Sequence, residues 1–220
     1  SCQYRNRCRR GCPFGAYFSS NSSTLPAAEA TGNMTLRPNS VVSEVLYDAD
    51  SKKATGVRLI DAETKEVIEY KAKVVFLCAS TVASTSILMQ STPDRFPNGM
   101  GNDSGELGHN MMDHHFRLGA TATIEGHEDK YYTGRRPNGI YIPRFRNIGG
   151  ATNRKDFIRG YGYQGGANRS DWTQIVNEMA YGEGLKEAVM KPGGWRIGMT
   201  AFGETLPYHE NKMYLNHNKK

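Results

Sequence analysis

Residues 74–91, VVFLCASTVASTSILMQS, decide the fold of this chain. Val74 to Ala79 are apolar on both alternating faces, which favours a central parallel strand covered on both sides. Ser80 and Thr81 then provide a tight turn, and from Val82 to Ser91 apolar residues recur at helical spacing. In open α/β sheets nucleotides bind at the carboxyl ends of the strands, and small residues let the backbone approach a ligand closely. The stretch therefore predicts a strand, a turn and a helix of a nucleotide-binding sheet.

A small antiparallel meander is expected immediately before this stretch. Short runs rich in β-branched residues alternate there with turn residues, and the runs are residues 34–37, 41–47, 54–61 and 67–71. A simple βαβ repeat would use a helix for this connection, so the meander favours the variant dinucleotide-binding fold found in many flavoproteins. A short helix is expected earlier, from Ser19 to Glu29, with Gly32 as its stop.

The character of the sequence changes after His115, where glycine and aromatic residues become more frequent. Longer strands are expected there, over residues 118–124, 140–145, 157–163 and 197–204. Residues 172–190 carry the one extended helical pattern of this half, weakened by Gly182 and Gly184. The predicted fold class is α/β plus α+β: part of a Rossmann-like domain with a β-meander over residues 1–116, then part of an antiparallel-sheet domain over residues 117–220.

Composition and charge exclude several classes of protein. The 220 residues are 38% hydrophobic and 23% charged, as in globular proteins, and no apolar run approaches the ~20 residues of a membrane-spanning helix. The net charge is +6, with the densest basic group at Arg5, Arg7, Arg9 and Arg10; this group could face a pyrophosphate or an acidic partner, or form a solvated face. No nucleic-acid-binding module is present, so no nucleic-acid partner is expected.

Both ends of the chain have the character of cut ends, because the first residue is Ser1 and no closing element follows the last expected strand. We therefore expect an internal piece of a longer protein. A leader sequence would lie outside these residues, so the compartment stays open, with the bacterial periplasm as our expectation.

Two motifs resemble those of the glucose-methanol-choline (GMC) oxidoreductases. Residues 80–91 resemble the second signature of the family, roughly G-A-x-x-S-P-x-L-L-x-x-S-G, although Thr85 stands where proline is usual and Thr92-Pro93 replace the final glycine. Residues 105–114, GELGHNMMDH, resemble the family's G-x-G-x-N-L-x-D-H segment at the crossing from the flavin domain to the substrate domain. The runs at residues 25–28, 33–36 and 42–45 also follow the family's order.

The resemblance implies a fold, a cofactor and site residues. Residues 1–116 would be part of an FAD-binding domain with a Cys-rich N-terminal segment, and residues 117–220 part of a substrate-binding domain. Val42 would offer backbone atoms to the adenine, Ala79 and Ser80 would approach the adenosine ribose, and Asn110 and His114 would lie near the flavin. Val42 and Ala79 are also compatible with ordinary core positions, and Asn110 with a turn cap.

Two of the family's central elements are absent from residues 1–220. They are the N-terminal G-x-G-x-x-G that seats the flavin pyrophosphate, and the C-terminal His with its His or Asn partner that takes the proton of the substrate hydroxyl. The catalytic residues are therefore unknown, and we do not expect the chain to catalyse the reaction alone. His109, His114 and His115 lack a metal-binding carboxylate pattern, so hydrogen bonding in the domain crossover is expected for them.

Cys2, Cys8 and Cys12 have the spacing C-x5-C-x3-C. This segment is similar to one in bacterial flavin-dependent glucose dehydrogenases, where C-C-x5-C before C-P-x-G-A holds an iron–sulfur cluster. Ser1 takes the place of the first adjacent cysteine, so either one ligand is missing or these three cysteines are the metal ligands. Zinc would favour paired C-x-x-C spacing, while a disulfide or free thiols remain the alternative. Cys78 is expected to be an inert thiol in the buried strand.

Two functions follow as hypotheses. In the first, the parent protein is an FAD-dependent dehydrogenase that oxidises a CH-OH group of a sugar, a sugar acid or another small alcohol by hydride transfer to flavin. An electron-acceptor protein or a cytochrome subunit would then be its partner. In the second, the chain is an iron–sulfur electron-transfer module or a non-catalytic binding module with vestigial flavin elements.

Overall fold

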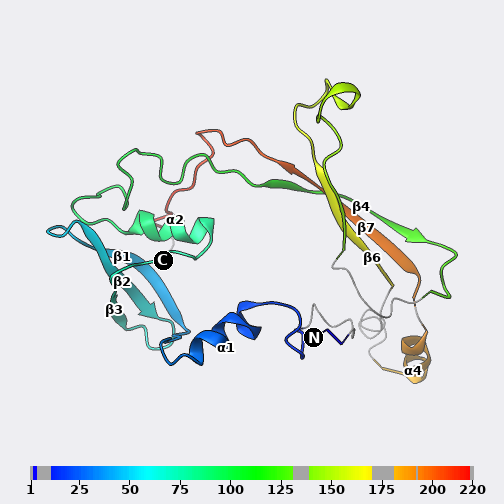
Figure 1. Cartoon of the computed structure of the whole chain (residues 1–220), viewed down its shortest axis with the longest axis horizontal. Coiled ribbons are helices and arrows are strands. Elements are labelled where there is room, and N and C mark those ends of the chain that lie inside the picture. The colour runs from blue at the N-terminus through cyan, green and yellow to red at the C-terminus, as the bar shows by residue number, and fades with distance from the viewer. Residues whose placement is uncertain (1, 4–10, 131–138, 170–180, 192, 219–220) are drawn as a thin grey trace. The chain divides into compact units, whose positions relative to one another are not determined.

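The computed structural model describes residues 2–3, 11–130, 139–169, 181–191 and 193–218 (Figure 1). The chain divides into two compact units, one of residues 1–32 and 113–205 and one of residues 33–112 and 206–220. Each unit contains one antiparallel sheet. The predicted mixture of helices and strands is confirmed, but the described residues contain no parallel, Rossmann-like sheet. The boundary between a flavin domain and a substrate domain at residues 116/117 stays a prediction.

The unit of residues 33–112 is built on a three-stranded meander. Its strands β1 (Ser40–Asp48), β2 (Lys53–Asp61) and β3 (Val67–Lys71) pair in sequence order. Three of the four predicted runs are thereby confirmed, but residues 34–37 form no strand. Arg37 instead donates from its guanidinium to the carboxylate of Asp61 at 2.8 Å and to the hydroxyl of Ser40 at 2.9 Å. These side-chain bonds hold the run at the end of the sheet, outside its ladder.

The two faces of the meander differ in polarity. Val45 and Leu59 lie on one face and are buried, with 5% and 4% of their surface exposed. On the other face Arg58 forms ion pairs with Glu44 on β1 and Glu69 on β3, so one guanidinium joins all three strands. Alternation of side chains along each strand therefore separates a core face from a charged face.

Helix α2 (Thr81–Gln90) packs against β1 and confirms the helix predicted from Val82 to Ser91 (Figure 1). Ile87 is its buried residue. Ser91, which follows the helix, is fully buried; its hydroxyl donates to the carbonyl oxygen of Ile87 at 2.7 Å and accepts from the N–H of Val45 at 2.8 Å. One serine therefore closes the helix and satisfies the outward N–H of an edge strand.

The strand predicted over residues 74–79 is wrong for this structure. These residues belong to no sheet, Val74 and Phe76 are 64% and 84% exposed, and Cys78 is exposed rather than buried. A parallel strand requires neighbours on which to pair, and the described residues place no strand beside it. The apolar pattern is typical of burial between layers, but the described residues supply no such layers there.

The sheet of the other unit has four strands in the order β4-β7-β6-β5 (Figure 1). They are β4 (His114–Ile124), β5 (Ile140–Ile142), β6 (Gly162–Arg169) and β7 (Trp195–Glu204). The strands predicted at residues 118–124 and 197–204 are confirmed, and the one at 140–145 is shorter than predicted. The strand predicted at 157–163 is wrong, because most of those residues form a loop and β6 begins only at Gly162.

The helices of this unit are short. A 3₁₀ turn (Ser20–Ser22), closed by reciprocal hydrogen bonds between Ser19 and Ser22, precedes α1 (Thr24–Glu29), so the helix predicted over residues 19–29 is confirmed in two pieces. Helix α4 (Glu183–Met190) lies within the pattern predicted over residues 172–190, of which residues 172–180 lie outside the described residues. Within the described residues, every helix is too short or too polar to cross a membrane.

The buried hydroxyl of Ser91 gives a stability test. In the Ser91→Ala variant the N–H of Val45 loses its partner in a fully buried position, which should cost about 1–3 kcal/mol of unfolding free energy. Urea unfolding followed by circular dichroism measures this loss. Thr92→Ala, at the exposed neighbouring residue, is the matched control and should change the unfolding free energy by less than about 0.5 kcal/mol. Equal effects of the two variants would contradict the role of Ser91.

Candidate functional site

The four-stranded sheet has one polar face and one apolar face, set by its register. His114 lies opposite Glu204, Gly162 opposite Phe202, and Gln164 opposite both Tyr141 and Thr200. Directly opposed residues project to the same side of a sheet. The polar face therefore continues across β4, β7, β6 and β5, with glycines at positions 119, 162, 166 and 198.

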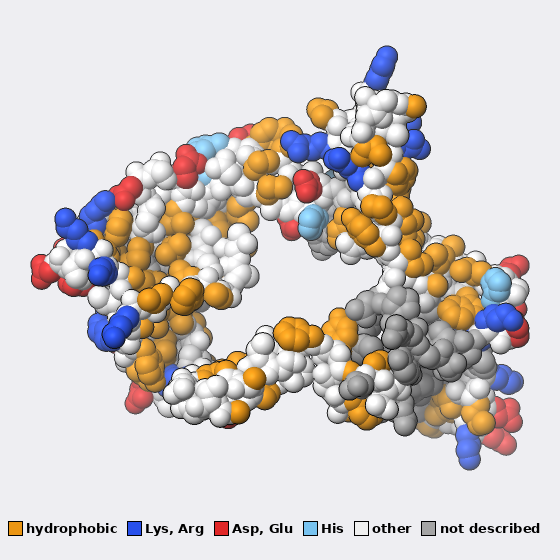
Figure 2. Space-filling view, viewed as in Figure 1, with side chains coloured by type: hydrophobic (Ala, Val, Ile, Leu, Met, Phe, Trp, Pro, Cys, Tyr) orange, Lys and Arg blue, Asp and Glu red, His pale blue; other side chains and the backbone are white. Residues whose placement is uncertain are grey.

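The opposite face is apolar. It carries Leu118, Ala120, Ala122 and Ile124 of β4 beside Ala201, Met199 and Ile197 of β7. Leu118 is 58% exposed and Ile140 43% exposed, and Figure 2 shows hydrophobic side chains gathered at the surface over this sheet. Two faces of such different chemistry indicate different neighbours: apolar packing on one, and water or a polar ligand on the other.

A hollow of about 520 Å³ lies on the polar face. Residues of the four strands form part of its wall: His114, Tyr141, Gly162, Gln164, Phe202, Gly203 and Glu204. Residues 144 and 159–161, from the connection between β5 and β6, supply the rest: Arg144, Arg159, Gly160 and Tyr161. This size is typical of sites for small organic ligands.

The connection between β5 and β6 is organised around Asn147. Its amide nitrogen donates to the carbonyl oxygens of Phe157 at 3.0 Å and Arg159 at 3.1 Å, and its amide oxygen accepts from the N–H of Arg154 at 2.7 Å. The backbone of Asn147 is in the left-handed region, with a φ of 53°. Phe145 and Tyr163 stack beside Tyr161 with centroids 6.3 Å apart. These contacts hold both ends of the connection over the sheet.

The wall of the hollow combines aromatic surfaces with hydrogen-bonding groups. The ring of His114 meets that of Phe202 edge to face, with centroids 5.9 Å apart. Gln164 and Glu204 offer amide and carboxylate groups, and Tyr141 adds a phenol. Apolar surface with a few converging polar groups is the usual composition of a site for a small polar molecule. Nearby, a hydrogen bond donated to Tyr161 and burial raise the pKa of Tyr163.

The entry to β4 and the exit from β7 are tied together beside the hollow. The N–H of Asp113 donates to the hydroxyl of Thr205 at 2.9 Å, and the N–H of Thr205 donates to the carbonyl oxygen of Asp113 at 2.9 Å. These bonds fix the register that puts His114 opposite Glu204. His114 is the one predicted site residue that lines the hollow; Arg144, Gln164, Phe202 and Glu204 were not singled out from the sequence.

The remaining predicted flavin residues belong to the unit of residues 33–112. Val42 lies on β1 opposite the buried Leu59. Ala79 and Ser80 are exposed just before α2; the N–H of Ala79 donates to the hydroxyl of Ser84 at 3.2 Å, and Ser80 has a φ of 75°. No side chain caps the N-terminus of α2. Small exposed residues before an open helix N-terminus suit a polar ligand, but the flavin roles of these residues stay predictions.

Asn110 is part of a network that pairs two distant segments of this unit. Its amide donates to the carboxylate of Glu106 at 3.0 Å, and that carboxylate lies 3.4 Å from Nε2 of His209. The rings of His109 and His209 stack with centroids 4.0 Å apart, and Nδ1 of His109 lies 2.7 Å from the carbonyl oxygen of His209. The hydrogen-bonding role expected for His109 is thereby observed.

Backbone hydrogen bonds extend this pairing. The N–H of Met111 donates to the carbonyl oxygen of Asn211 at 2.9 Å, and the N–H of Met213 donates to that of Gly108 at 3.0 Å. Gly108 has a φ of 87°, and a Cβ placed there would lie 2.3 Å from Cε of Met89 and 3.1 Å from the carbonyl oxygen of Met213. Glycine at this position therefore allows both the left-handed backbone and the close pairing.

A pair of glycine variants separates these two requirements. Gly105 and Gly108 both have positive φ, but nothing lies within 4 Å of a Cβ built on Gly105. Gly105→Ala should cost about 1 kcal/mol of unfolding free energy from backbone strain alone, and Gly108→Ala about 1–3 kcal/mol more because the pairing must shift. Urea unfolding of both variants measures the difference. Equal losses would show that the close approach at Gly108 contributes nothing.

The predicted metal ligands are only partly described. Cys2 and Cys12 are described, whereas Cys8 lies outside the described residues. Around Cys12 the chain turns so that backbone N–H groups surround the sulfur and lower the pKa of the thiol, those of Phe14, Tyr17 and Ala16. The described residues contain no group of three or more metal-binding side chains. N–H groups directed at sulfur stabilise a thiolate, the form that binds metals, so the surroundings of Cys12 suit a metal-bound sulfur.

The lowered pKa of Cys12 predicts its alkylation profile. Only the thiolate reacts, so labelling of metal-free, reduced protein by iodoacetamide should reach half its maximal rate below the about pH 8.5 of an unperturbed thiol. Mass spectrometry of the peptide that contains Cys12, over a series of pH values, measures this midpoint. In urea the backbone N–H groups disperse and the midpoint should rise to the ordinary value. A folded-state midpoint at or above about 8.5 would exclude the thiolate-stabilising turn.

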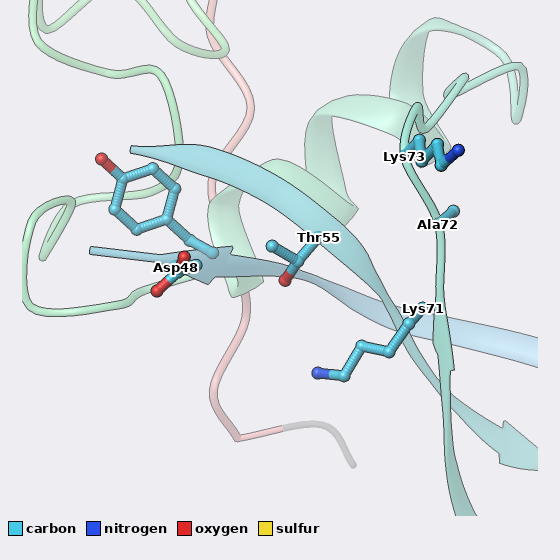
Figure 3. Close-up of a pocket in the computed structure, with 6 residues that line it drawn as sticks. Asp48, Thr55, Lys71, Ala72 and Lys73 are labelled. Atoms are coloured by element: carbon cyan, nitrogen blue, oxygen red, sulfur yellow. The ribbon is translucent and has the colours of Figure 1, made fainter. Parts of the chain in front are cut away.

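A second hollow lies at the end of the meander and is wide open (Figure 3). Two of its three charged groups are already engaged: Lys71 pairs with Glu69 at 3.2 Å, and Asp48 accepts hydrogen bonds from the hydroxyl and N–H of Ser51. These bonds with Ser51 lower the pKa of Asp48. The hollow on the polar sheet face is therefore the stronger candidate.

The family of the chain follows from comparison with known proteins. A family model described as GMC oxidoreductase matches residues 1–116, just over half of the chain. The chain belongs to the GMC oxidoreductase family, as its motifs predict. This membership implies FAD as the cofactor and oxidoreductase chemistry.

Two curated relatives are dehydrogenases. The chain is 27% identical over 219 residues to 2-methyl-1,2-propanediol dehydrogenase of Mycolicibacterium austroafricanum, with 96% of this chain covered. It is 25% identical over 225 residues to the fructose dehydrogenase large subunit of Gluconobacter japonicus, with 100% of this chain covered. The chain spans only 38% and 39% of the length of these relatives.

Proposed function

We propose that this chain acts within an FAD-dependent dehydrogenase that oxidises a CH-OH group of a sugar or another small alcohol. The observation that carries the proposal is the hollow on the polar face of the β4-β7-β6-β5 sheet in a member of the GMC family. The relatives support it, because both are named dehydrogenases and their named compounds are a diol and a sugar.

The residues of the hollow suit the recognition of a sugar. Phe202 and Tyr161 present aromatic surface, on which the C–H groups of a sugar ring can pack. Gln164 can donate and accept hydrogen bonds, and Glu204 accepts them, so neighbouring hydroxyls of one ligand can each find a partner. Glycine at position 162 leaves the backbone uncovered between them. The chain thereby orients a polyhydroxylated ligand on a rigid sheet.

Bound FAD would supply the hydride acceptor of this reaction. For its adenosine half we propose Val42 on β1 together with Ala79 and Ser80. Ala79 and Ser80 form an exposed turn of small residues before the uncapped N-terminus of α2. Asn110 and His114 are proposed to lie near the flavin ring. His114 carries the strongest support of these, because it lines the hollow proposed for the substrate.

We also propose that Cys2, Cys8 and Cys12 hold an iron–sulfur cluster that passes electrons to an acceptor protein or cytochrome subunit. The N–H groups around Cys12 support this. The fructose dehydrogenase relative is named as a large subunit, which supports a partner subunit for this chain too. Iron and sulfide without flavin in the full-length protein would favour the competing function, an electron-transfer module with vestigial flavin elements.

The proposed substrate role of Gln164 is testable in the full-length protein. Gln164→Leu removes the hydrogen-bonding amide at similar volume, so kcat/KM for a sugar substrate, measured with an electron-accepting dye, should fall by roughly twofold to tenfold. Asn168→Leu is the matched control, because Asn168 lies on the same strand and face as Gln164 but outside the hollow. A fall in both variants, or in neither, would place the substrate elsewhere.

A further inference from the structure

The hollow contains more positive than negative charge. Arg144 and Arg159 line it together with one carboxylate, that of Glu204. Neither guanidinium forms an ion pair within the described part of the chain. Arg154, in the same connection, differs: it pairs with both carboxylate oxygens of Asp156, at 2.9 Å and 2.8 Å. Arg144 and Arg159 therefore keep their charges available to a ligand in the hollow.

The backbone holds the two arginines close together. Arg144 follows β5 and Arg159 precedes β6, and Asn147 ties this connection by bonding the carbonyl oxygen of Arg159 itself. The side chain of Arg144 lies directly against Gly160, where a Cβ would come within 2.2 Å of its Cγ. Only a residue without a side chain leaves room for Arg144 in this position. The aliphatic stem of Arg144 therefore crosses the residue that follows Arg159.

We propose that the substrate of this hollow is a sugar that carries a carboxylate, held by Arg144 and Arg159. The proposal rests on the proposed function and names its substrate class. A guanidinium matches the two oxygens of a carboxylate with parallel N–H donors. The aromatic residues and Gln164 would then contact the sugar ring, while Glu204 would accept from its hydroxyls at a distance from the anion. A neutral sugar would leave both arginines without a partner.

Binding of two matched sugars tests this inference. D-Glucuronate and D-glucose share one ring and differ by a carboxylate in place of a hydroxymethyl group. Isothermal titration calorimetry of the full-length protein, with its flavin reduced by dithionite under anaerobic conditions, measures binding without turnover. We expect D-glucuronate to bind at least tenfold more tightly than D-glucose, about the factor that one charge-assisted hydrogen bond provides. Added salt should weaken the binding of D-glucuronate and not that of D-glucose.

Variants assign the preference to residues. Arg144→Met and Arg159→Met keep the aliphatic stem and remove the charge. Each should therefore weaken the binding of D-glucuronate by about 10- to 100-fold and leave the affinity for D-glucose unchanged. Arg144→Lys should restore part of the loss, because it keeps the charge but not the paired donors. Arg154→Met is the control and should change neither affinity. Retention of the flavin confirms that each variant is folded.

Separate results decide the inference and the proposed function. Equal affinity of the wild-type protein for the two sugars, or an equal loss of both in Arg144→Met, would overturn the carboxylate site. Flavin reduction by a neutral sugar would still support the dehydrogenase. Selective D-glucuronate binding that depends on both arginines, without flavin reduction by any sugar, would support the carboxylate site and refute the proposed function.

Discussion

The register of the β4-β7-β6 sheet is the constraint on which the candidate site depends. Because side chains alternate along a strand, a slip of one residue would move His114, Gln164 and Phe202 to the opposite face and replace the hollow with apolar residues. Two features fix the register. One is the pair of hydrogen bonds between Asp113 and Thr205, and the other is a bulge between His115 and Leu118, where β4 has one residue more than β7. The polar face is therefore a result of strand pairing and of no single loop.

The second unit shows how family motifs serve structure as well as ligands. Ser91 closes the signature helix, yet its hydroxyl is wholly used in joining α2 to β1. Gly108 and Asn110 stand in the crossover motif, and both support the pairing of this segment with residues 209–213. These contacts give the two motif residues a structural role of their own. Ala79 and Ser80 differ, because their exposure leaves them available to a ligand.

Local patterns predict the helix α2 and the strands β1, β2 and β3, because side-chain periodicity and turn residues act over a few positions. Residues 74–79 failed, since a parallel strand depends on neighbours that local sequence does not reveal. The predicted start of β6 is wrong because residues 157–161, with Phe157 and Tyr161, resemble a strand but pack in a loop around Asn147. The glycines of β6 itself weaken the strand pattern of that segment. Of the residues that line the hollow, the sequence predicts only His114, through the family motif. Arg144, Gln164 and Glu204 come together only when distant strands pair, so no short motif marks them.

We propose that the polar face of the β4-β7-β6-β5 sheet receives the substrate of a flavin-dependent dehydrogenase. A crystal structure of the full-length protein with FAD and a bound sugar acid tests it most directly. We expect the sugar ring to lie against Phe202 and Gln164, its carboxylate on Arg144 and Arg159, and apolar packing on the face that carries Leu118 and Met199. A sugar bound away from this hollow, or a flavin facing the apolar side of the sheet, would contradict it.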